Sequence, residues 1–435
     1  MEEGKRKGKA VVVGGSIAGI SCAHALIGAG WEVVVLEKTS ALPTGSPTGA
    51  GLGLDPLARK LIESWLPQPD LLHQSTLPLT IHEVSIWMTL FFRILDHKAT
   101  DAEKKISWKL TRDEDFNFRA AYWADLYTLL YNALPQSIVF WAHSFLSFSL
   151  SDDKSRVTVK TKVLTTGDTI SIVGDLLVAA DGCLSSIRQS FLPDFKLRYS
   201  GNCAWRGVLD FSNNENSEAI IGIKAAYPDL GRCLYFHLGS RTHSALYELL
   251  NKRINWIWYI NHPEPELKGT SVTMKVSNEM VKKMHELAEK VWPREFARLI
   301  RETKDPFINV IYDADPLEKL CWDNVVLVGD AAHPTTPHGL RSTNMSVLDA
   351  AVLGKCLEKW GLENLTSALE EYQCVRLPVA SEQVLHSRRL GRIKQGLPLP
   401  DRHAFDPKNA TADECEELQL KKIPYFSDAP SLLSI

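Results

Sequence analysis

The stretch that most constrains the fold of this chain runs from residue 10 to residue 38. Residues 11–13 are three valines, the composition of a buried parallel strand. A tight glycine turn follows, then a helix of small residues that ends near residues 28–30, and then a second apolar strand at 33–36. This order predicts a βαβ unit. Its helix N-terminus, with unpaired N–H groups and a favourable dipole, is suited to a pyrophosphate.

The turn fits the dinucleotide-binding fingerprint with one departure. Glu37 follows the second strand, about 20 residues after the turn, where a carboxylate can accept hydrogen bonds from both ribose hydroxyls. Ser16 takes the second glycine position, and serine is small enough to be tolerated there. The alternative is a glycine-rich turn that binds nothing. We predict a bound dinucleotide contacted by Gly14, Gly15, Ser16, Ile17, Ala18, Gly19, Glu37 and Lys38.

Length and composition limit the function classes. A chain of 435 residues is too long for one core, which favours two domains or one domain with a large insertion. Its net charge of −3 gives no reason to expect nucleic acid or an anionic membrane as a partner. The eight cysteines are scattered without a Cys-x-x-Cys pair, so we expect no metal site, no disulfide scaffold and a reducing compartment.

No signal peptide or membrane span is evident in the sequence, so a cytoplasmic protein is expected. The apolar segment 84–95 is too short to span a bilayer and carries Arg93. It is either a buried or interfacial segment or the product of a wrongly placed exon boundary.

The remaining pattern predicts alternating helical and strand regions. Helices are expected at 56–65, 120–134, 275–301 (interrupted at Pro293), 344–360 and 365–394. A meander of strands is expected at 145–150, 156–163 and 169–173, and an antiparallel sheet within 199–275. A solvated face explains the basic residues that end the last helix, Arg388, Arg389, Arg392 and Lys394.

Two further polar turns follow buried strands. The strand at 176–180 ends in residues 181–188, and the strand at 325–328 ends in Gly329-Asp330. Side chains at the carboxyl ends of parallel strands face the crevice where such sheets bind ligands. Arg188 could supply a fixed charge for a phosphate or form a salt bridge on a helix surface. Asp330 could also cap the following helix.

The three sites, in this order and spacing, resemble the class A FAD-dependent aromatic monooxygenases, the para-hydroxybenzoate hydroxylase-like group. The resemblance runs from about residue 9 to about residue 394. It implies FAD at the first site and contact with both FAD and incoming NADH or NADPH at the second. At the third, a carboxylate accepts from the ribityl chain. The residues that match the second and third motifs are Asp181, Gly182, Ser185 and Arg188, and Gly329 and Asp330.

The resemblance implies an α/β fold in which a Rossmann-like FAD/NAD(P)-binding domain carries an inserted antiparallel β-sheet substrate domain and C-terminal helices. Residues 1–75, 110–190 and 300–395 are expected to form the FAD-binding domain. Residues 76–109 and 191–299 are expected to form the substrate domain, and 396–435 a C-terminal tail.

The implied reaction is hydroxylation of a small aromatic or N-heteroaromatic substrate with O₂ and NAD(P)H, through a flavin C4a-hydroperoxide. Residues 199–207 and 335–338 look like the members that act on N-heteroaromatic rings, such as dihydroxypyridine and urate hydroxylases. We expect the carbonyl of Pro337 to border the reacting oxygen and His338 to be the base or to orient it. The alternative for His338 is a loop histidine that is hydrogen-bonded to a neighbouring carbonyl. Arg206, Tyr235, Trp256 and Trp258 could line the substrate face of the sheet, although alternating core packing explains the aromatic residues equally well. A homodimer is one further expectation.

The sequence departs from the family at two places. Leu340 and Ser342 replace two glycines in the loop beside the flavin ring, although Pro337 and Asn344 match. Trp123 stands where many members carry an arginine, and whether Arg119 substitutes for it is open.

Two other functions therefore stay open. One is another FAD oxidoreductase of reductase or halogenase type, because residues 256–261 resemble the halogenase motif Trp-x-Trp-x-Ile-Pro with Asn261 in place of the proline. The other is a flavin-binding protein that has lost catalysis, which only the two glycine replacements favour.

Overall fold

The computed structural model describes residues 7–42, 49–78, 117–239, 241–267, 271–274, 276–419 and 433, together with the backbone of four strands between residues 81 and 113. The segment 84–95 falls in this region, and its side chains lie outside the described residues. The four strands are β5 (Ile81–Ser85), β6 (Met88–Phe92), β7 (Ile94–Asp101) and β8 (Ile106–Asp113).

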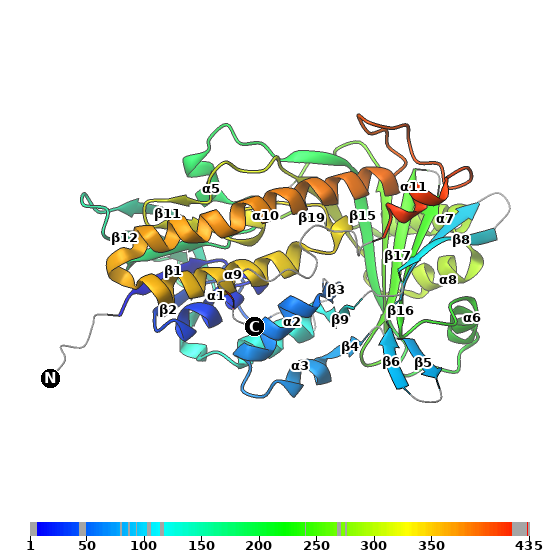
Figure 1. The fold of residues 1–435 in the computed structure, drawn as a ribbon, viewed down its shortest axis with the longest axis horizontal. Coiled ribbons are helices and arrows are strands. Elements are labelled where there is room, and N and C mark those ends of the chain that lie inside the picture. Colours follow the sequence, from blue (N-terminus) through cyan, green and yellow to red (C-terminus); the bar gives the residue numbers. More distant parts are fainter. Residues whose placement is uncertain are drawn as a thin grey trace.

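A largely parallel sheet organises one half of the molecule (Figure 1). Its strand order is β10-β2-β1-β14-β22-β21, and only the edge strand β21 runs antiparallel. The three valines of β1 are buried because the sheet is covered on both faces. The bounds are β1 (Lys9–Val13), β2 (Glu32–Leu36), β10 (Val139–Phe140), β14 (Leu176–Ala179), β21 (Cys321–Trp322) and β22 (Val325–Leu327).

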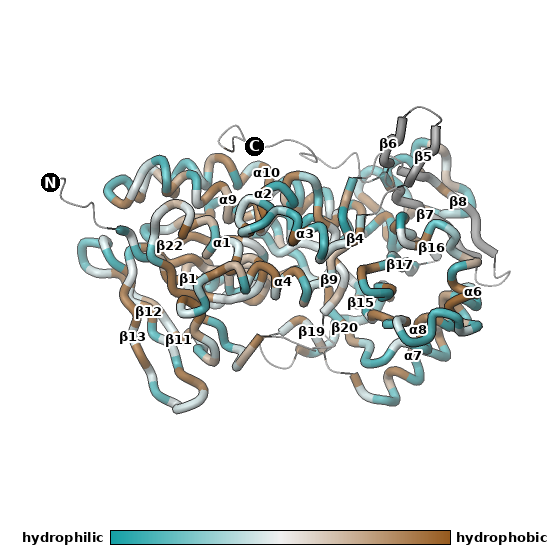
Figure 2. The backbone as a smooth tube through the Cα atoms, turned by 90° about the horizontal axis from the view of Figure 1, so that it is seen from below, coloured by the Kyte–Doolittle hydropathy of each residue, from teal (hydrophilic) through white to brown (hydrophobic). Residues whose placement is uncertain are grey.

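Helices cover one face of this sheet and a β-meander covers the other (Figure 2). On the helical side, α1 (Ile17–Gly28) packs on α9 (Ser342–Trp360), which packs on α10 (Leu365–Lys394). The meander of β11 (His143–Leu150), β12 (Val157–Val163) and β13 (Thr169–Gly174) contacts β1, β2 and β14. The strands predicted at 145–173 are therefore confirmed.

An antiparallel sheet dominates the other half, in the order β19-β20-β15-β18-β17-β16-β7-β8. Its one parallel pair is β16 with β7. Helices α6 (Glu218–Ala226), α7 (Asn278–Val291) and α8 (Arg294–Glu302) bury its outer face. The remaining bounds are β15 (Arg198–Asp210), β16 (Cys233–Gly239), β17 (Thr242–Leu249), β18 (Arg253–Asn261), β19 (Thr273–Met274) and β20 (Phe307–Asp313).

A small sheet lies between the two large ones (Figure 1) and contains β3 (Gly51–Leu54), β9 (Arg119–Tyr122) and β4 (Thr76–Pro78). After β3, Asp55 caps α2 (Pro56–Trp65) by accepting from the Ala58 amide, and proline opens the helix. The short helix α3 (Asp70–Ser75) precedes β4.

Two predictions were wrong in detail. The helix predicted at 120–134 is α4 (Trp123–Asn132), because the residues before it pair with β3 and β4 as strand β9. The basic end of α10 is not a solvated face: Arg388 bonds to Asp313 and Asp315, and Lys394 is 1% exposed.

Described residues after 396 pack against the rest of the chain, where a tail was expected. Phe405, Cys415 and Leu418 are buried in one cluster with side chains of the antiparallel sheet, and α11 (Ala412–Glu416) lies within this segment. Among the described helices, none is long and apolar enough to cross a membrane.

Candidate functional site

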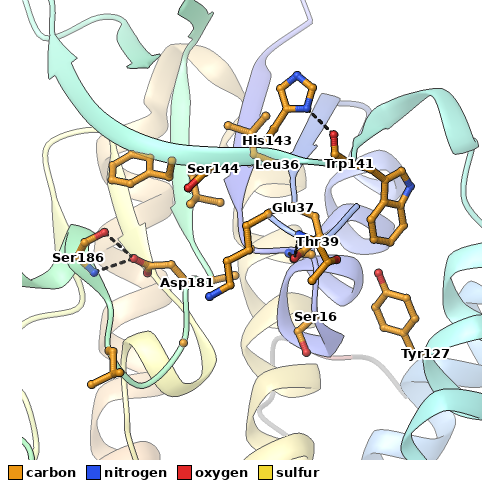
Figure 3. A pocket seen from close by; sticks show the side chains of 18 of the residues that line it. Ser16, Leu36, Glu37, Thr39, Tyr127, Trp141, His143, Ser144, Asp181 and Ser186 are labelled. Carbon is orange, nitrogen blue, oxygen red and sulfur yellow. Dashed lines mark hydrogen bonds between the residues drawn. The ribbon is translucent and has the colours of Figure 1, made fainter. Parts of the chain in front are cut away.

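The first cavity opens at the carboxyl ends of β1, β2 and β14, and we call it the β1 cavity. It has a volume of about 660 Å³, and its walls include Gly14, Gly15, Ser16, Glu37, Lys38, Asp181 and Gly182. Figure 3 shows Glu37 and Thr39 between two walls, with Tyr127 and Trp141 on one side and Asp181 and Ser186 on the other. Ile17, Ala18 and Gly19 form the first turn of α1 beside it.

Close backbone contacts explain the glycines of the turn. Gly14 has a φ of +103°, and a Cβ there would lie 2.2 Å from the carbonyl oxygen of Ala180. A Cβ on Gly19 would lie 1.8 Å from the carbonyl oxygen of Gly14. Ser16 caps α1 without a side-chain hydrogen bond, so no side chain caps the first-turn amides. The turn thus presents a helix N-terminus suited to a phosphate.

Two backbone amides, one of them in the glycine turn, hold the carboxylate of Glu37 in place. One carboxylate oxygen accepts from the Gly15 amide at 2.8 Å, and the other accepts from the Thr39 amide at 2.8 Å. A carboxylate oxygen has more than one lone pair, so both oxygens can still accept hydroxyl donors from the cavity.

Asp181 and Arg188 organise the second polar turn from within. Asp181 accepts from the hydroxyl of Ser185 at 2.6 Å and from the amide of Ser186 at 2.9 Å, at the start of α5 (Ser186–Phe191). Arg188 is 2% exposed, so it forms no surface salt bridge. It donates to the carbonyls of Cys183, Asp330 and Ala331 at 2.6, 3.2 and 2.8 Å, which ties the second motif to the third.

A second cavity lies between the third motif and the antiparallel sheet, and we call it the inner cavity. Its volume is about 270 Å³. Gly182 borders the β1 cavity and Cys183 borders the inner cavity, so the two lie on either side of one loop. The inner cavity is lined by β3, by the loop 335–343 and by Arg206, Phe236, His243, Tyr247, Ile257, Tyr259 and Asp330.

The loop with the two glycine replacements is fixed by its own side chains. Leu340 has a φ of +55°, the left-handed conformation that normally favours glycine. Ser342 donates its hydroxyl to Asp330 at 2.9 Å. Asn344 donates to the carbonyls of Gly53 and Leu340 at 2.9 and 2.8 Å, so it joins this loop to β3. Asn344 therefore positions the loop through its side-chain amide.

His338 lies at the wall of the inner cavity with its ring buried. Its centroid is 4.8 Å from that of Tyr259 and 5.0 Å from that of His243. Neither ring nitrogen has a hydrogen-bond partner among the described residues. Burial, reinforced by Lys394 and Arg206, lowers the pKa of His338 to about 3. The imidazole is therefore neutral at physiological pH, with one nitrogen able to donate and the other to accept.

A buried charge cluster beneath the third motif was missed. Asp349 of α9 accepts from His333 at 2.6 Å, from Arg376 at 2.7 Å and from the Gly329 amide at 2.8 Å. Burial would raise the pKa of Asp349, but His333 and Arg376 hold it well below its usual range. The signal in the sequence was a carboxylate in the middle of the small apolar residues 345–354 of α9, because a carboxylate needs partners when buried.

A second missed pair involves Arg341, which bonds to Asp55, the cap of α2. Both side chains are almost fully buried at 2% and 1% exposure. This pair joins the loop 335–343 to the start of α2, so one ion pair, one hydroxyl–carboxylate hydrogen bond and one side-chain amide fix that loop.

Burial raises the pKa of the Asp330 carboxyl group. The hydrogen bond from Ser342 and the interactions with His333 and Arg188 lower this pKa and partly oppose the effect of burial.

The structure corrects the predicted substrate face. Arg206 pairs in register with Ile257, and both line the inner cavity together with Tyr259. Trp256 and Trp258 point to the opposite face and are buried under α7 and α8, as is Tyr235. Of the two explanations of this alternation, core packing holds for the three aromatic residues and lining of the cavity holds for Arg206. The two tryptophans of the halogenase-like motif therefore do not line the cavity.

Arg119 does not take the place of the arginine that Trp123 replaces. It donates to the Thr76 hydroxyl at 2.6 Å and to the carbonyls of His73 and Thr76, facing away from both cavities. Trp123, which stacks on Tyr127, lines the β1 cavity itself.

No family model matches this chain. It is 32% identical over 227 residues to the aurachin C monooxygenase/isomerase of Stigmatella aurantiaca, which covers 51% of this chain and about half (52%) of that protein. It is 24% identical to the 6-hydroxynicotinate 3-monooxygenase of Pseudomonas fluorescens, over 85% of this chain and 88% of that protein.

Among solved structures, the fold matches that of Klebsiella pneumoniae HpxO complexed with FAD and uric acid, with a TM-score of 0.70 at 21% identity. The match covers 89% of each chain. The relatives and solved structures that resemble this chain are thus FAD-dependent monooxygenases of aromatic and N-heteroaromatic compounds, which confirms the resemblance drawn from its three motifs.

Proposed function

We propose that this chain is an FAD-dependent monooxygenase that hydroxylates a small aromatic or N-heteroaromatic compound at the expense of NADH or NADPH and O₂. The observation that carries the proposal is the placement of the two cavities on either side of residues 181–183. An elongated dinucleotide can lie with its ribose at Glu37, its phosphates at the start of α1 and its ring system near Asp330.

The chain's own residues fit this group. The backbone approaches of Gly14 and Gly19 leave no room for side chains in the turn, as a phosphate cradle requires. Asp330 is directed by Ser342 and stands beside the inner cavity, where its carboxylate can accept from a polyol. Bound FAD would supply the electron transfer and oxygen chemistry that no amino-acid side chain provides.

The inner cavity supplies groups that bind and orient an aromatic ring. Arg206 places a cation against Tyr247 and Tyr259 and can pair with an ionised hydroxyl or carboxylate of the substrate. His338, neutral and buried, can orient a ring hydroxyl or N–H; its low pKa favours this role over that of a base. The Pro337 carbonyl already accepts from the Leu340 amide at 3.0 Å.

The domain division into 1–75, 110–190 and 300–395 against 76–109 and 191–299 belongs to the same proposal, except that β20 (Phe307–Asp313), which pairs with β15 in the antiparallel sheet, goes with the substrate part. So does a cytoplasmic location, which the eight free cysteines favour.

The test starts with the purified chain. The flavin absorption band reports bound FAD, and NADH or NADPH oxidation is followed with and without phenolic and N-heteroaromatic compounds. We expect oxidation stimulated by an aromatic compound and a product that has gained one oxygen atom. Asp330→Ala should lose FAD with an unchanged circular dichroism spectrum, while Asp315→Ala, an exposed carboxylate outside the cavities, should keep it. Bound flavin that neither nicotinamide reduces would refute the proposal and leave a flavin-binding protein without this activity.

A further inference from the structure

A third concavity adjoins the inner cavity, and the proposed reaction does not use it. It is an open groove of about 930 Å³ along β19, which we call the β19 groove. The antiparallel sheet and the start of α7 form one wall, and β3 and α4 contribute the other. Its apolar side chains include Leu52, Trp123, Met274, Val276, Val281 and Phe307.

The groove and the inner cavity share a border. Leu52, Arg206 and Asn309 line both. Asn309 is held in place by donating to the Thr273 hydroxyl at 2.7 Å, and Arg206 is fixed in the sheet between β18 and β20. A molecule bound at Arg206 can therefore extend from the inner cavity into the groove.

The size of the inner cavity makes such an extension relevant. About 270 Å³ is at the small end of ligand sites, and the flavin ring of the proposed function would take part of it. The remaining space suits a single substituted ring. Any longer substituent on that ring must leave through a neighbouring opening.

The described lining of the groove favours an uncharged chain over a dinucleotide. Apart from Arg206 at the border, the lining residues that the structure describes include no lysine or arginine, and Asp305 contributes a carboxylate. A pyrophosphate is bound by cations or by helix N-termini. The N-terminus of α7 at the groove is already capped by the Ser277 side chain, which accepts from the Met280 amide, and carries Glu279 in its first turn. Half-buried apolar side chains such as Leu52, Met274 and Val281 instead favour an uncharged hydrocarbon chain.

We propose that the β19 groove holds an apolar chain attached to the aromatic ring of the substrate, with Arg206 and Asn309 at the junction between ring and chain. The substrate class is then an alkyl- or polyprenyl-substituted aromatic compound, in place of a bare ring. This rests on the proposed function, because it assumes that the ring binds in the inner cavity.

The test uses 5-alkylresorcinols from methyl through pentyl to nonyl as probes, titrated into the FAD-loaded protein by calorimetry. Full burial of a methylene strengthens binding roughly fourfold, and a half-open groove gives about twofold. We therefore expect the pentyl compound to bind at least about tenfold more tightly than the methyl compound.

Two variants of one helix separate the groove from general surface effects. Asn278→Trp at the exposed start of α7 fills the groove and should abolish the gain from the longer chain, leaving the methyl compound unaffected. Leu287→Trp on the same helix, 39% exposed and outside the groove, should behave as the unaltered protein.

Binding that does not vary with chain length, or no binding at any length, overturns the inference. So does a rise in the Michaelis constant for NADH or NADPH in Asn278→Trp with the chain-length gain intact, which would assign the groove to the nicotinamide. Failure of the proposed function is distinct, because calorimetry reads binding without turnover. In that case, neither NADH nor NADPH would reduce the bound flavin, while the chain-length gain persists.

Discussion

Lys394 gives the sharpest prediction, because its ammonium group is buried without a counter-charge. It is 1% exposed at the end of α10, and its Nζ has no hydrogen-bond partner among the described residues. Its one favourable contact for a cation is the ring of Phe236, whose centroid lies 3.6 Å away. Burial lowers the pKa of Lys394 from 10.5 to about 7.

This shift sets both the sign and the size of the effect on stability. The unfolded chain keeps the proton up to about pH 10.5, whereas the folded chain releases it above about pH 7, so folding becomes more favourable as the pH rises between these values. The shift corresponds to about 5 kcal/mol of destabilisation at low pH, of which the cation–π contact offsets about 1–2 kcal/mol. We expect Lys394→Met to be about 3 kcal/mol more stable than the unaltered protein at pH 7 and about 2 kcal/mol more stable at pH 9, where the folded lysine is neutral and only the proton on the unfolded chain still contributes.

The assay is urea unfolding of both proteins at pH 7 and pH 9 with saturating FAD. Lys290→Met, at the exposed end of α7, is the matched control and should give the same difference from the unaltered protein at both pH values. A Lys394→Met advantage that stays constant from pH 7 to pH 9, or a variant less stable than the unaltered protein at pH 7, would refute the reasoning.

Three further substitutions test the site. Asp349→Asn leaves the buried Arg376 guanidinium without its carboxylate and alters the hydrogen bond to His333, and should cost about 3–5 kcal/mol in urea unfolding. Gly14→Ala forces a Cβ to 2.2 Å from the Ala180 carbonyl, so FAD content measured by absorbance should fall sharply, whereas Gly167→Ala, with open space around its Cβ, should retain FAD. Arg188→Lys cannot donate to three carbonyls with the same fork; it should lower the melting temperature and weaken FAD binding, and unchanged values for both would contradict the bridging role.

The sequence pattern predicted a segment correctly where residues close to it in the sequence determine its secondary structure. Helices α2 and α10 begin and end where predicted. The Asp55-Pro56 pair starts α2, and the first turns of α10 contain no proline or glycine. Helix α4 was predicted too long since its first residues are apolar enough for either state. Only pairing with β3 and β4 makes them a strand.

Side-chain roles depended on contacts between distant segments. Arg188 looked like a phosphate ligand or a surface residue, yet it binds carbonyls up to 143 residues away. Trp256 and Tyr259 alternate as a strand requires, but alternation does not say which face meets the inner cavity and which meets α7 and α8.

By itself, the sequence determined the βαβ unit, the three polar turns and the family they resemble, because glycine spacing and strand-end carboxylates are local requirements of a dinucleotide site. Only the tertiary structure decided how the loop 335–343, which borders the inner cavity, is held in place. Ser342, Arg341 and Asn344 secure the glycine-poor loop through Asp330, Asp55 and Gly53. Those partners lie as far as 291 residues away, and buried polar groups take whichever partners the fold brings to them.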